Sequence, residues 1–277
     1  MKLKTIFILN TLLLLQMEVW AQHGSLFIIG GGDRPPSLMR TMIDAAELSS
    51  RDHIVILTMS SADPDTSYYY ILQDLQPFCQ QVIAKLQFAK ENAQDKTMLD
   101  SLRSAKLIFI TGGVQSRFMD VVLNTPIYTA IHEAYDRGAM IAGTSAGAAV
   151  MSREMITGEQ WRADTLYSGA VDRMVRDNIQ IAQGLGLLTS AIIDQHFVKR
   201  SRYNRLLTVL NQYPGKTCIG IDEETAILVK GHTARVYGES QVIVMKNPRG
   251  TTYSKDKKLR MEKATLSILT EGDRFKL

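Results

Sequence analysis

Cysteine is scarce in this sequence: Cys79 and Cys218 are the only two among 277 residues. Two cysteines cannot build the dense disulfide framework of a small secreted domain. They could form one disulfide or remain two buried thiols, and we expect thiols. The paired cysteine spacing of a zinc site is missing too, so neither a metal nor an organic cofactor is expected.

Large blocks of one charge are also missing. The chain has 32 Lys and Arg against 28 Asp and Glu, a net charge of +4. Because nucleic-acid-binding domains usually carry a clustered basic face, we expect no nucleic-acid partner. Long apolar runs are confined to the first 22 residues, and no later segment approaches the roughly 18 apolar residues of a membrane span.

The N-terminus has the pattern of a secretory signal peptide. Lys2 and Lys4 precede a mostly apolar run, residues 5–17, and the small residue Ala21. We expect cleavage after Ala21, so that residues 1–21 are the signal peptide; the alternative is an uncleaved anchor. We therefore expect a secreted or periplasmic protein that has no membrane association after cleavage. No linker or internal repeat interrupts residues 22–277, which predicts one domain.

Apolar runs alternate with helix-like stretches in the first half of the chain. Helical spacing occurs in residues 37–50, 95–104 and 128–137. The strand-like runs are residues 25–30, 53–59, 81–88, 106–111 and 139–142. This alternation predicts an α/β fold, a doubly wound and mostly parallel sheet with helices on both faces.

The second half of the chain is less regular. Residues 152–178 are polar and predict a long excursion over the cleft, and residues 203–213 have helical spacing. Strands are expected at residues 218–230, 234–237 and 242–245, where a turn at Gly231 predicts an antiparallel C-terminal edge.

Small residues follow four of the early strands. The clusters are Gly31-Gly32-Asp33, Ser60-Ser61, Gly112-Gly113 and residues 143–147. Ligands of open α/β sheets bind beyond the carboxyl ends of the strands. We therefore expect the four clusters to line one cleft, although glycine also begins ordinary turns.

Residues 143–147, Gly-Thr-Ser-Ala-Gly, match the G-x-S-x-G pattern of a nucleophile elbow. A serine on such a tight turn needs small neighbours, and the turn lifts its Oγ into the cleft. Ser145 is therefore the candidate nucleophile, with the backbone N–H groups of Gly113 and Ala146 as oxyanion donors. The alternative is a small-residue corner between a strand and a helix.

A nucleophilic serine needs a base, and the chain has five histidines. His196 follows the apolar run Ile192-Ile193 and is expected at a strand end, at the cleft. The orienting acid is sought in residues 222–224, after the histidine. In the α/β-hydrolase order the acid precedes the histidine, so Asp172 or Asp177 would serve instead.

Basic residues follow His196 at helical spacing. Lys199, Arg202 and Arg205 would share one helix face, either solvated or facing the cleft. Since arginine binds carboxylates through two hydrogen bonds, the second arrangement favours an acidic substrate.

Four segments in order resemble the cyanophycinases of peptidase family S51, which also holds peptidase E. They are TGGVQ (111–115), GTSAGAAVM (143–151), DQHFVKRSRYNRL (194–206) and GIDEETA (220–226), with GLGLL (184–188) also similar. The resemblance runs from about Ser25 to at least Val229. It implies a class I glutamine-amidotransferase-like sandwich and a homodimer.

The same resemblance implies a Ser-His-Glu triad of Ser145, His196 and Glu223, with Glu224 left open as the acid. The substrate-binding residues it implies are Gln115, Asp194, Gln195, Arg200, Arg202 and Arg205. The implied reaction is hydrolysis of cyanophycin, multi-L-arginyl-poly-L-aspartate, to β-Asp-Arg dipeptides. The alternatives are an S51-type aspartyl or isoaspartyl peptidase acting on other acidic peptides, and a catalytically silent secreted binding protein.

Overall fold

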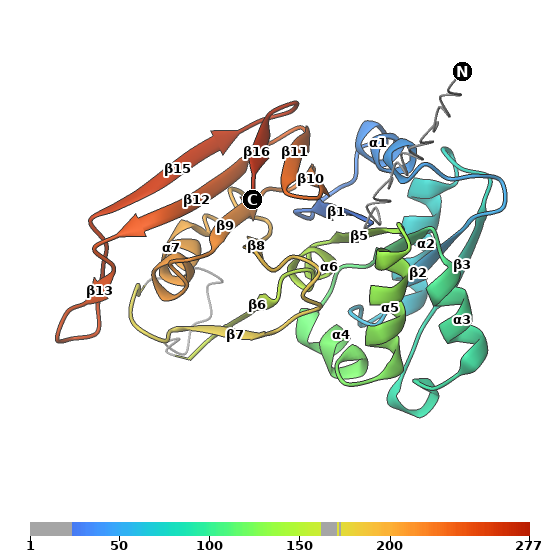
Figure 1. Cartoon of the computed structure of the whole chain (residues 1–277), viewed down its shortest axis with the longest axis horizontal. Coiled ribbons are helices and arrows are strands. Elements are labelled where there is room, and N and C mark those ends of the chain that lie inside the picture. The colour runs from blue at the N-terminus through green and yellow to red at the C-terminus, as the bar shows by residue number, and fades with distance from the viewer. Residues whose placement is uncertain (1–23, 162–170, 172) are drawn as a thin grey trace, which may run out of the picture.

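A computed structural model of the chain describes residues 24–161, 171 and 173–277 (Figure 1). The predicted signal peptide, residues 1–21, lies outside the described residues, as does Asp172. Within the described part, no helix has the length and apolar character needed to cross a membrane.

Helices and strands alternate along the first half of the chain, and strands dominate the second. The helices are α1 (Pro36–Ala46), α2 (Pro64–Leu75), α3 (Lys96–Ser104), α4 (Gln115–Val122), α5 (Pro126–Asp136), α6 (Ala146–Ala149) and α7 (Tyr203–Gln212), with a 3-10 turn η1 (Lys90–Asn92). The first eight strands are β1 (Ser25–Ile29), β2 (His53–Leu57), β3 (Val82–Leu86), β4 (Leu107–Ile110), β5 (Met140–Thr144), β6 (Glu154–Gln160), β7 (Ile179–Gln183) and β8 (Ala191–Asp194). The others are β9 (Thr217–Ile221), β10 (Thr225–Lys230), β11 (Thr233–Gly238), β12 (Val242–Arg249), β13 (Thr252–Tyr253), β14 (Leu259–Arg260), β15 (Lys263–Leu269) and β16 (Arg274–Lys276).

The large sheet has the order β16-β11-β10-β1-β5-β4-β2-β3. Its five early strands, β1 to β5, are parallel, and β10, β11 and β16 extend one edge in antiparallel fashion. This confirms the predicted fold class, including the antiparallel edge. All four strands that end in small-residue clusters, β1, β2, β4 and β5, lie side by side in this sheet.

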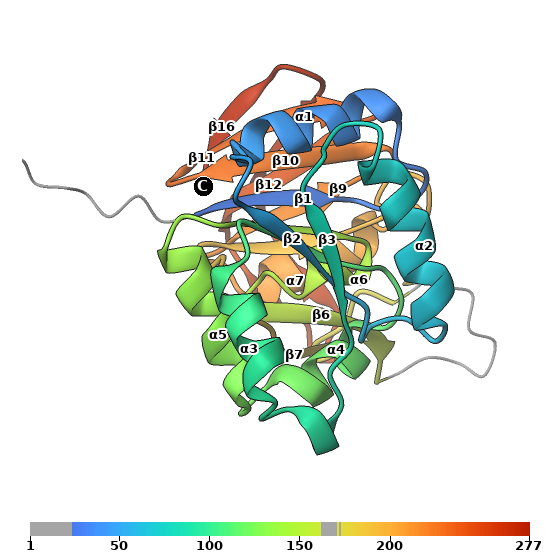
Figure 2. The same ribbon diagram turned by 90° about the vertical axis from the view of Figure 1, so that its right-hand side faces the viewer.

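Successive side chains along a strand point to opposite faces of the large sheet, and helices cover both faces. On β1, Phe27 and Ile29 pack with α1 and α2, whereas Leu26 and Ile28 pack with α3 and α5. Figure 2 shows the result, with α2 and α5 on opposite sides of β2 and β3. The period of two in a continuously apolar strand is what buries both faces.

A second sheet, β15-β12-β9-β8, carries the later half of the site. The helix α7 packs on it through Leu206, Val209 and Leu210, in a separate core with Phe197 and Met245. In Figure 1 this sheet and α7 lie to the left, and β2, β3 and α3 lie to the right. Two loops of this sheet, after β8 and after β9, reach back toward the end of β1.

Some sequence expectations were wrong in detail. Residues 218–230 were expected as one strand, but they form β9 in the second sheet and β10 in the large one. The chain reverses between them at residues 222–224, where Glu224 has φ 56°. Helices α2 and α4 were not expected, and neither were the strands after residue 249.

Both cysteines are free. Cys218 is buried on β9, and the half-buried Cys79 donates from Sγ to the Leu75 carbonyl. The expectation of two thiols is confirmed, although only Cys218 is fully buried. Burial raises the pKa of the Cys218 thiol far above its usual range, so this sulfur stays protonated and inert.

Candidate active site

Ser145 occupies a strained turn between β5 and α6. Its backbone has φ 54° and ψ −107°, a conformation that a residue with a side chain rarely adopts. The turn is fixed because the Ser145 N–H donates to the Ile29 carbonyl of β1 at 3.1 Å. Only glycine fits at position 147, where a Cβ would lie 2.2 Å from the Ile110 carbonyl oxygen. This is the geometry expected of a nucleophile elbow.

His196 meets the serine from the second sheet. Its Nε2 lies 2.8 Å from Ser145 Oγ, and it follows β8 in a loop where its own φ is 49°. The His196 N–H donates to the Gly30 carbonyl at 2.8 Å, which ties the loop to the end of β1. The ring lies so close to Gly31 that a Cβ there would be 2.3 Å from His196 Cε1.

Glu223 holds the other side of the imidazole. Its Oε1 lies 2.6 Å from His196 Nδ1, and its side chain lies against Gly32. Glu224 instead uses its backbone N–H to bind the Gly31 carbonyl at 2.9 Å. Of the two acids left open by the sequence, the structure therefore brings Glu223 to the histidine. Asp177 is exposed and forms no hydrogen bond with His196.

Burial lowers the pKa of His196 below its ordinary value of 6.5. The hydrogen bond to Glu223 acts in the opposite direction, and the positive charge of Arg200 adds to the lowering. The imidazole is consequently neutral at neutral pH, with Nε2 free to accept a proton. A neutral imidazole between a hydroxyl and a carboxylate is the arrangement of a general base.

The residues that flank His196 form a buried polar network. Arg205 donates from Nε to Asp194 Oδ2 at 2.8 Å and from Nη2 to Asp194 Oδ1. Arg202 donates from Nη1 to both the backbone and side-chain oxygens of Gln195, at 2.6 and 2.5 Å. These four side chains are all nine-tenths or more buried.

This network gives Asp194, Gln195, Arg202 and Arg205 contacts within the protein, and their expected substrate-binding roles stay predictions. The helix α7 begins only at Tyr203, so the basic residues before it do not share a helix face. Arg205 and Asp194 form a buried pair through Nε and Nη2 of the guanidinium, so at least one edge of Arg205 is used within the protein. Their contacts hold the loop that carries His196.

Gln115 is also committed to the protein. Its Nε2 donates to the carbonyls of Ile156 and Thr157 at 2.9 and 2.7 Å, and the residue is buried. Its amide nitrogen thus anchors β6 beside the site, and the expected contact of Gln115 with a substrate stays a prediction. Arg200, in contrast, is exposed and close enough to His196 to lower its pKa, so it alone of the expected arginines faces solvent at the site.

Of the two predicted oxyanion donors, Ala146 follows Ser145 directly and Gly113 follows Gly112, which lies against the serine. Ala146 is the first residue of α6, and the Gly112-Gly113 segment passes so close that a Cβ on Gly112 would lie 3.5 Å from Ser145 Cβ. Within the described residues, neither the Gly113 nor the Ala146 N–H is used in a backbone hydrogen bond. Two unused donors beside a serine can stabilise a developing oxyanion.

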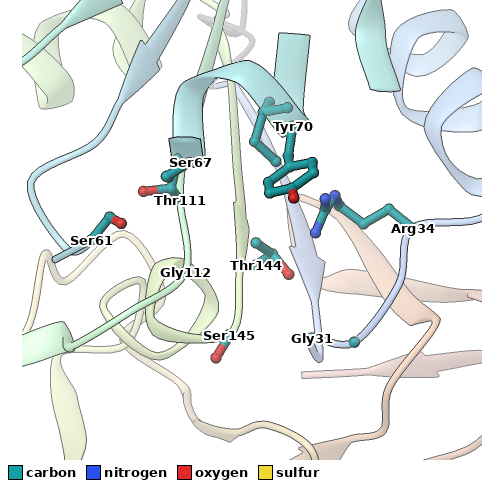
Figure 3. A pocket seen from close by; sticks show the side chains of 11 residues that line it. Gly31, Arg34, Ser61, Ser67, Tyr70, Thr111, Gly112, Thr144 and Ser145 are labelled. Carbon is teal, nitrogen blue, oxygen red and sulfur yellow. The ribbon is translucent and has the colours of Figure 1, made fainter. Parts of the chain in front are cut away.

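A hollow of about 260 Å³ opens beside Ser145 (Figure 3). Its lining includes Gly31, Gly32, Ser61, Gly112, Thr144 and Ser145, which confirms that the four small-residue clusters meet at one rim. Arg34, Ser67 and Tyr70 also line it and were missed from the sequence. The signal for Arg34 was its place directly after a glycine cluster; the other two lie on α2, which the sequence did not reveal. Among the described residues, no cluster of metal-ligating side chains occurs.

Comparison with known proteins identifies the family. Residues 60–237 match the model of peptidase family S51. The chain is 29% identical to a cyanophycinase from Trichormus variabilis, over 93% of this chain and 87% of that one. A cyanophycinase from Synechococcus elongatus is 29% identical over 92% and 79%, and one from Geminocystis herdmanii is 33% identical over 66% of each chain. The chain belongs to peptidase family S51 and is a serine-type peptidase.

Solved structures share the fold. A peptidase from an acI-B1 Actinobacterium superposes with a TM-score of 0.68 at 21% identity, over 93% of this chain and 98% of that one. A putative peptidase E protein from Listeria monocytogenes gives 0.56 at 15% identity, over 79% and 100%. These similarities support the glutamine-amidotransferase-like sandwich.

Proposed function

We propose that this peptidase hydrolyses cyanophycin to β-Asp-Arg dipeptides, with Ser145, His196 and Glu223 as its catalytic triad. The observation that carries the proposal is the hydrogen-bonded chain from Ser145 Oγ through His196 to Glu223. The curated relatives with the matching sequence are cyanophycinases, which supports the substrate.

In the proposed first step, Ser145 Oγ attacks the scissile carbonyl while His196 Nε2 takes its proton. The C–O bond forms as the carbonyl double bond opens, and the Gly113 and Ala146 N–H groups stabilise the oxyanion. Glu223 stabilises the imidazolium at Nδ1 without taking the proton. Collapse of the intermediate breaks the C–N bond, and the imidazolium protonates the leaving amine.

In the second step, water replaces the amine. His196 removes a proton from the water, which attacks the acyl-serine and forms a second oxyanion. The ester bond then breaks, and the proton returns from Nε2 to Ser145 Oγ. The products are one free carboxyl group and one free amine, and the enzyme is restored with no external oxidant, reductant or cofactor.

The test of the substrate is product identification by mass spectrometry. Purified mature protein is incubated with cyanophycin, with peptides containing β-Asp-Arg, and with α-aspartyl dipeptides. We expect β-Asp-Arg from the first two. Activity on α-aspartyl dipeptides alone would contradict the cyanophycin assignment and indicate a peptidase for other acidic peptides. No turnover of any substrate would favour a silent binding protein.

We further propose that the enzyme is exported and acts outside the cytoplasm on polymer released by other cells. The support is the signal-like pattern of residues 1–21. N-terminal sequencing of the protein from its producing cells should begin at Gln22; an intact Met1 would contradict it. The homodimer stays a prediction that size-exclusion chromatography with light scattering can test.

A further inference from the structure

The hollow beside Ser145 holds one charged residue among the described side chains that line it, Arg34. The residue lies in the loop between β1 and α1, and its guanidinium points toward the ring of Tyr70 on the wall of the hollow (Figure 3). No carboxylate lines this hollow. Because Arg34 is ion-paired with Asp74 of α2, the hollow offers the remaining N–H groups of this guanidinium rather than a net positive charge.

Arg34 is held in place at one edge only. Its Nε donates to Asp74 Oδ2 of α2 at 2.6 Å, and the two side chains are 18% and 26% exposed. A guanidinium has five N–H donors in a rigid fork. Within the described residues, the two terminal nitrogens of Arg34 have no partner. Asp74 thus fixes the orientation while an edge suited to a carboxylate stays available.

The rest of the hollow also carries polar groups, and one of them lacks a hydrogen-bond partner. The Thr144 hydroxyl is buried and has no hydrogen-bond partner. Buried polar atoms nearly always have one, so the floor has unused hydrogen-bonding capacity. Tyr70, which is 55% exposed, forms a wall beside the Arg34 guanidinium in Figure 3. A tyrosine so exposed gains a contact surface if a ligand lies between its ring and the serine.

We propose that this hollow is a carboxylate subsite in which Arg34, positioned by Asp74, binds a free carboxylate of the substrate unit next to the scissile bond. The inference rests on the proposed function, since a β-aspartyl-arginine unit carries free carboxylates. It adds Arg34 to the arginines that the sequence offered as a source of acidic specificity. Arg34 is a specificity residue and Asp74 is a positioning residue.

The kinetic test uses a short peptide of linked β-Asp-Arg units and derivatives in which each free carboxylate is amidated in turn. We expect Arg34→Gln to raise KM about 10- to 100-fold with kcat nearly unchanged, because a charge-assisted hydrogen bond is lost from binding. One amidated peptide should show the same loss with the wild type and no further loss with Arg34→Gln. Arg34→Lys should keep part of the affinity.

The matched control is Arg51→Gln, which removes the same charge from an exposed turn. Arg51 precedes β2 and so lies at the amino-terminal ends of the parallel strands, whereas the site lies at their carboxyl ends. It should keep the wild-type KM. An Arg34→Gln variant with wild-type KM, or with an equal loss on every peptide, would overturn the subsite. Asp74→Asn should raise KM less than Arg34→Gln.

A binding measurement separates this inference from the proposed function. Calorimetry with the Ser145→Ala protein needs no turnover, and the same peptides should bind more weakly when Arg34→Gln is added, for the free carboxylate only. If the wild type cleaves no β-aspartyl peptide yet shows this difference, the function fails and the subsite stands. If the peptides are cleaved and Arg34→Gln changes neither KM nor binding, the subsite fails. No binding of any of these carboxylates would also overturn it.

Discussion

Arg205 donates from Nε and from Nη2 to the carboxylate of Asp194, and both side chains are almost completely buried. Removing one partner of a buried ion pair leaves the other charge unpaired in a poor solvent. Asp194 ends β8, two residues before His196, and Arg205 lies on α7. The pair therefore fixes the start of the loop that carries His196.

Arg205→Ala should therefore lower the free energy of unfolding by about 3–5 kcal/mol, measured by urea denaturation. The control is Arg200→Ala, an exposed residue whose replacement should change stability by less than about 0.5 kcal/mol. A stable Arg205→Ala protein that differs only in KM would favour the substrate-binding role expected from the sequence.

The methyl group that Gly31→Ala adds should displace the imidazole of His196, the proposed base. A Cβ at this position would lie 2.3 Å from His196 Cε1, and the backbone φ of +117° adds strain. A misplacement of about 1 Å costs a reaction about 100-fold, so we expect a fall in kcat/KM of that order. Gly215→Ala is the matched control, because no atom lies within 4 Å of its Cβ. Equal activity of the two variants would contradict the close packing of Gly31 and His196.

The pH dependence should report the lowered pKa of His196. Only the neutral imidazole accepts the serine proton, so kcat/KM should rise with pH through this pKa and level off above it. Because burial is the largest cause of the shift, the midpoint should lie below 6.5. Arg200→Gln removes a positive charge that disfavours the imidazolium, so its midpoint should move to higher pH. A midpoint above 6.5 in the wild type, or a downward move in the variant, would contradict this electrostatic account.

The orienting acid can be identified by two adjacent variants. Glu223→Gln keeps the size of the side chain but removes the charge that stabilises the imidazolium at Nδ1, so kcat should fall about 10³- to 10⁴-fold. Glu224→Gln should leave kcat within a few-fold, since the structural contact of Glu224 is made by its backbone N–H. The opposite ranking would move the acid to Glu224.

The parallel half of the fold was predictable because its strands are buried on both faces and end in glycine or serine. Helix α2 was not, since its outer face carries Tyr69 and Tyr70 and its amphipathic pattern is weak. Between β9 and β10 the three acids of residues 222–224 interrupt the apolar pattern, but the sequence does not show that the two strands belong to different sheets.

In the site, the sequence predicted those features that depend on a few neighbouring residues. The turn at Ser145 follows from two glycines and His196 from its place after an apolar run, whereas the choice of Glu223 among residues 222–224 came from the resemblance. The roles of Arg202 and Arg205 could not be derived in this way, because burial depends on where α7 begins and on which strand lies beneath it. A sequence shows that arginines are present, whereas only the fold shows whether Asp194 has already neutralised them.

The most direct measurement of the central claim is the initial rate of dipeptide release from cyanophycin by Ser145→Ala compared with the wild type. The variant removes one oxygen from a turn of small residues, so circular dichroism and the unfolding midpoint should be unchanged. We expect the rate to fall by at least about 10³-fold, the usual consequence of losing a triad member. A folded Ser145→Ala protein that releases dipeptide within tenfold of the wild-type rate would contradict the account.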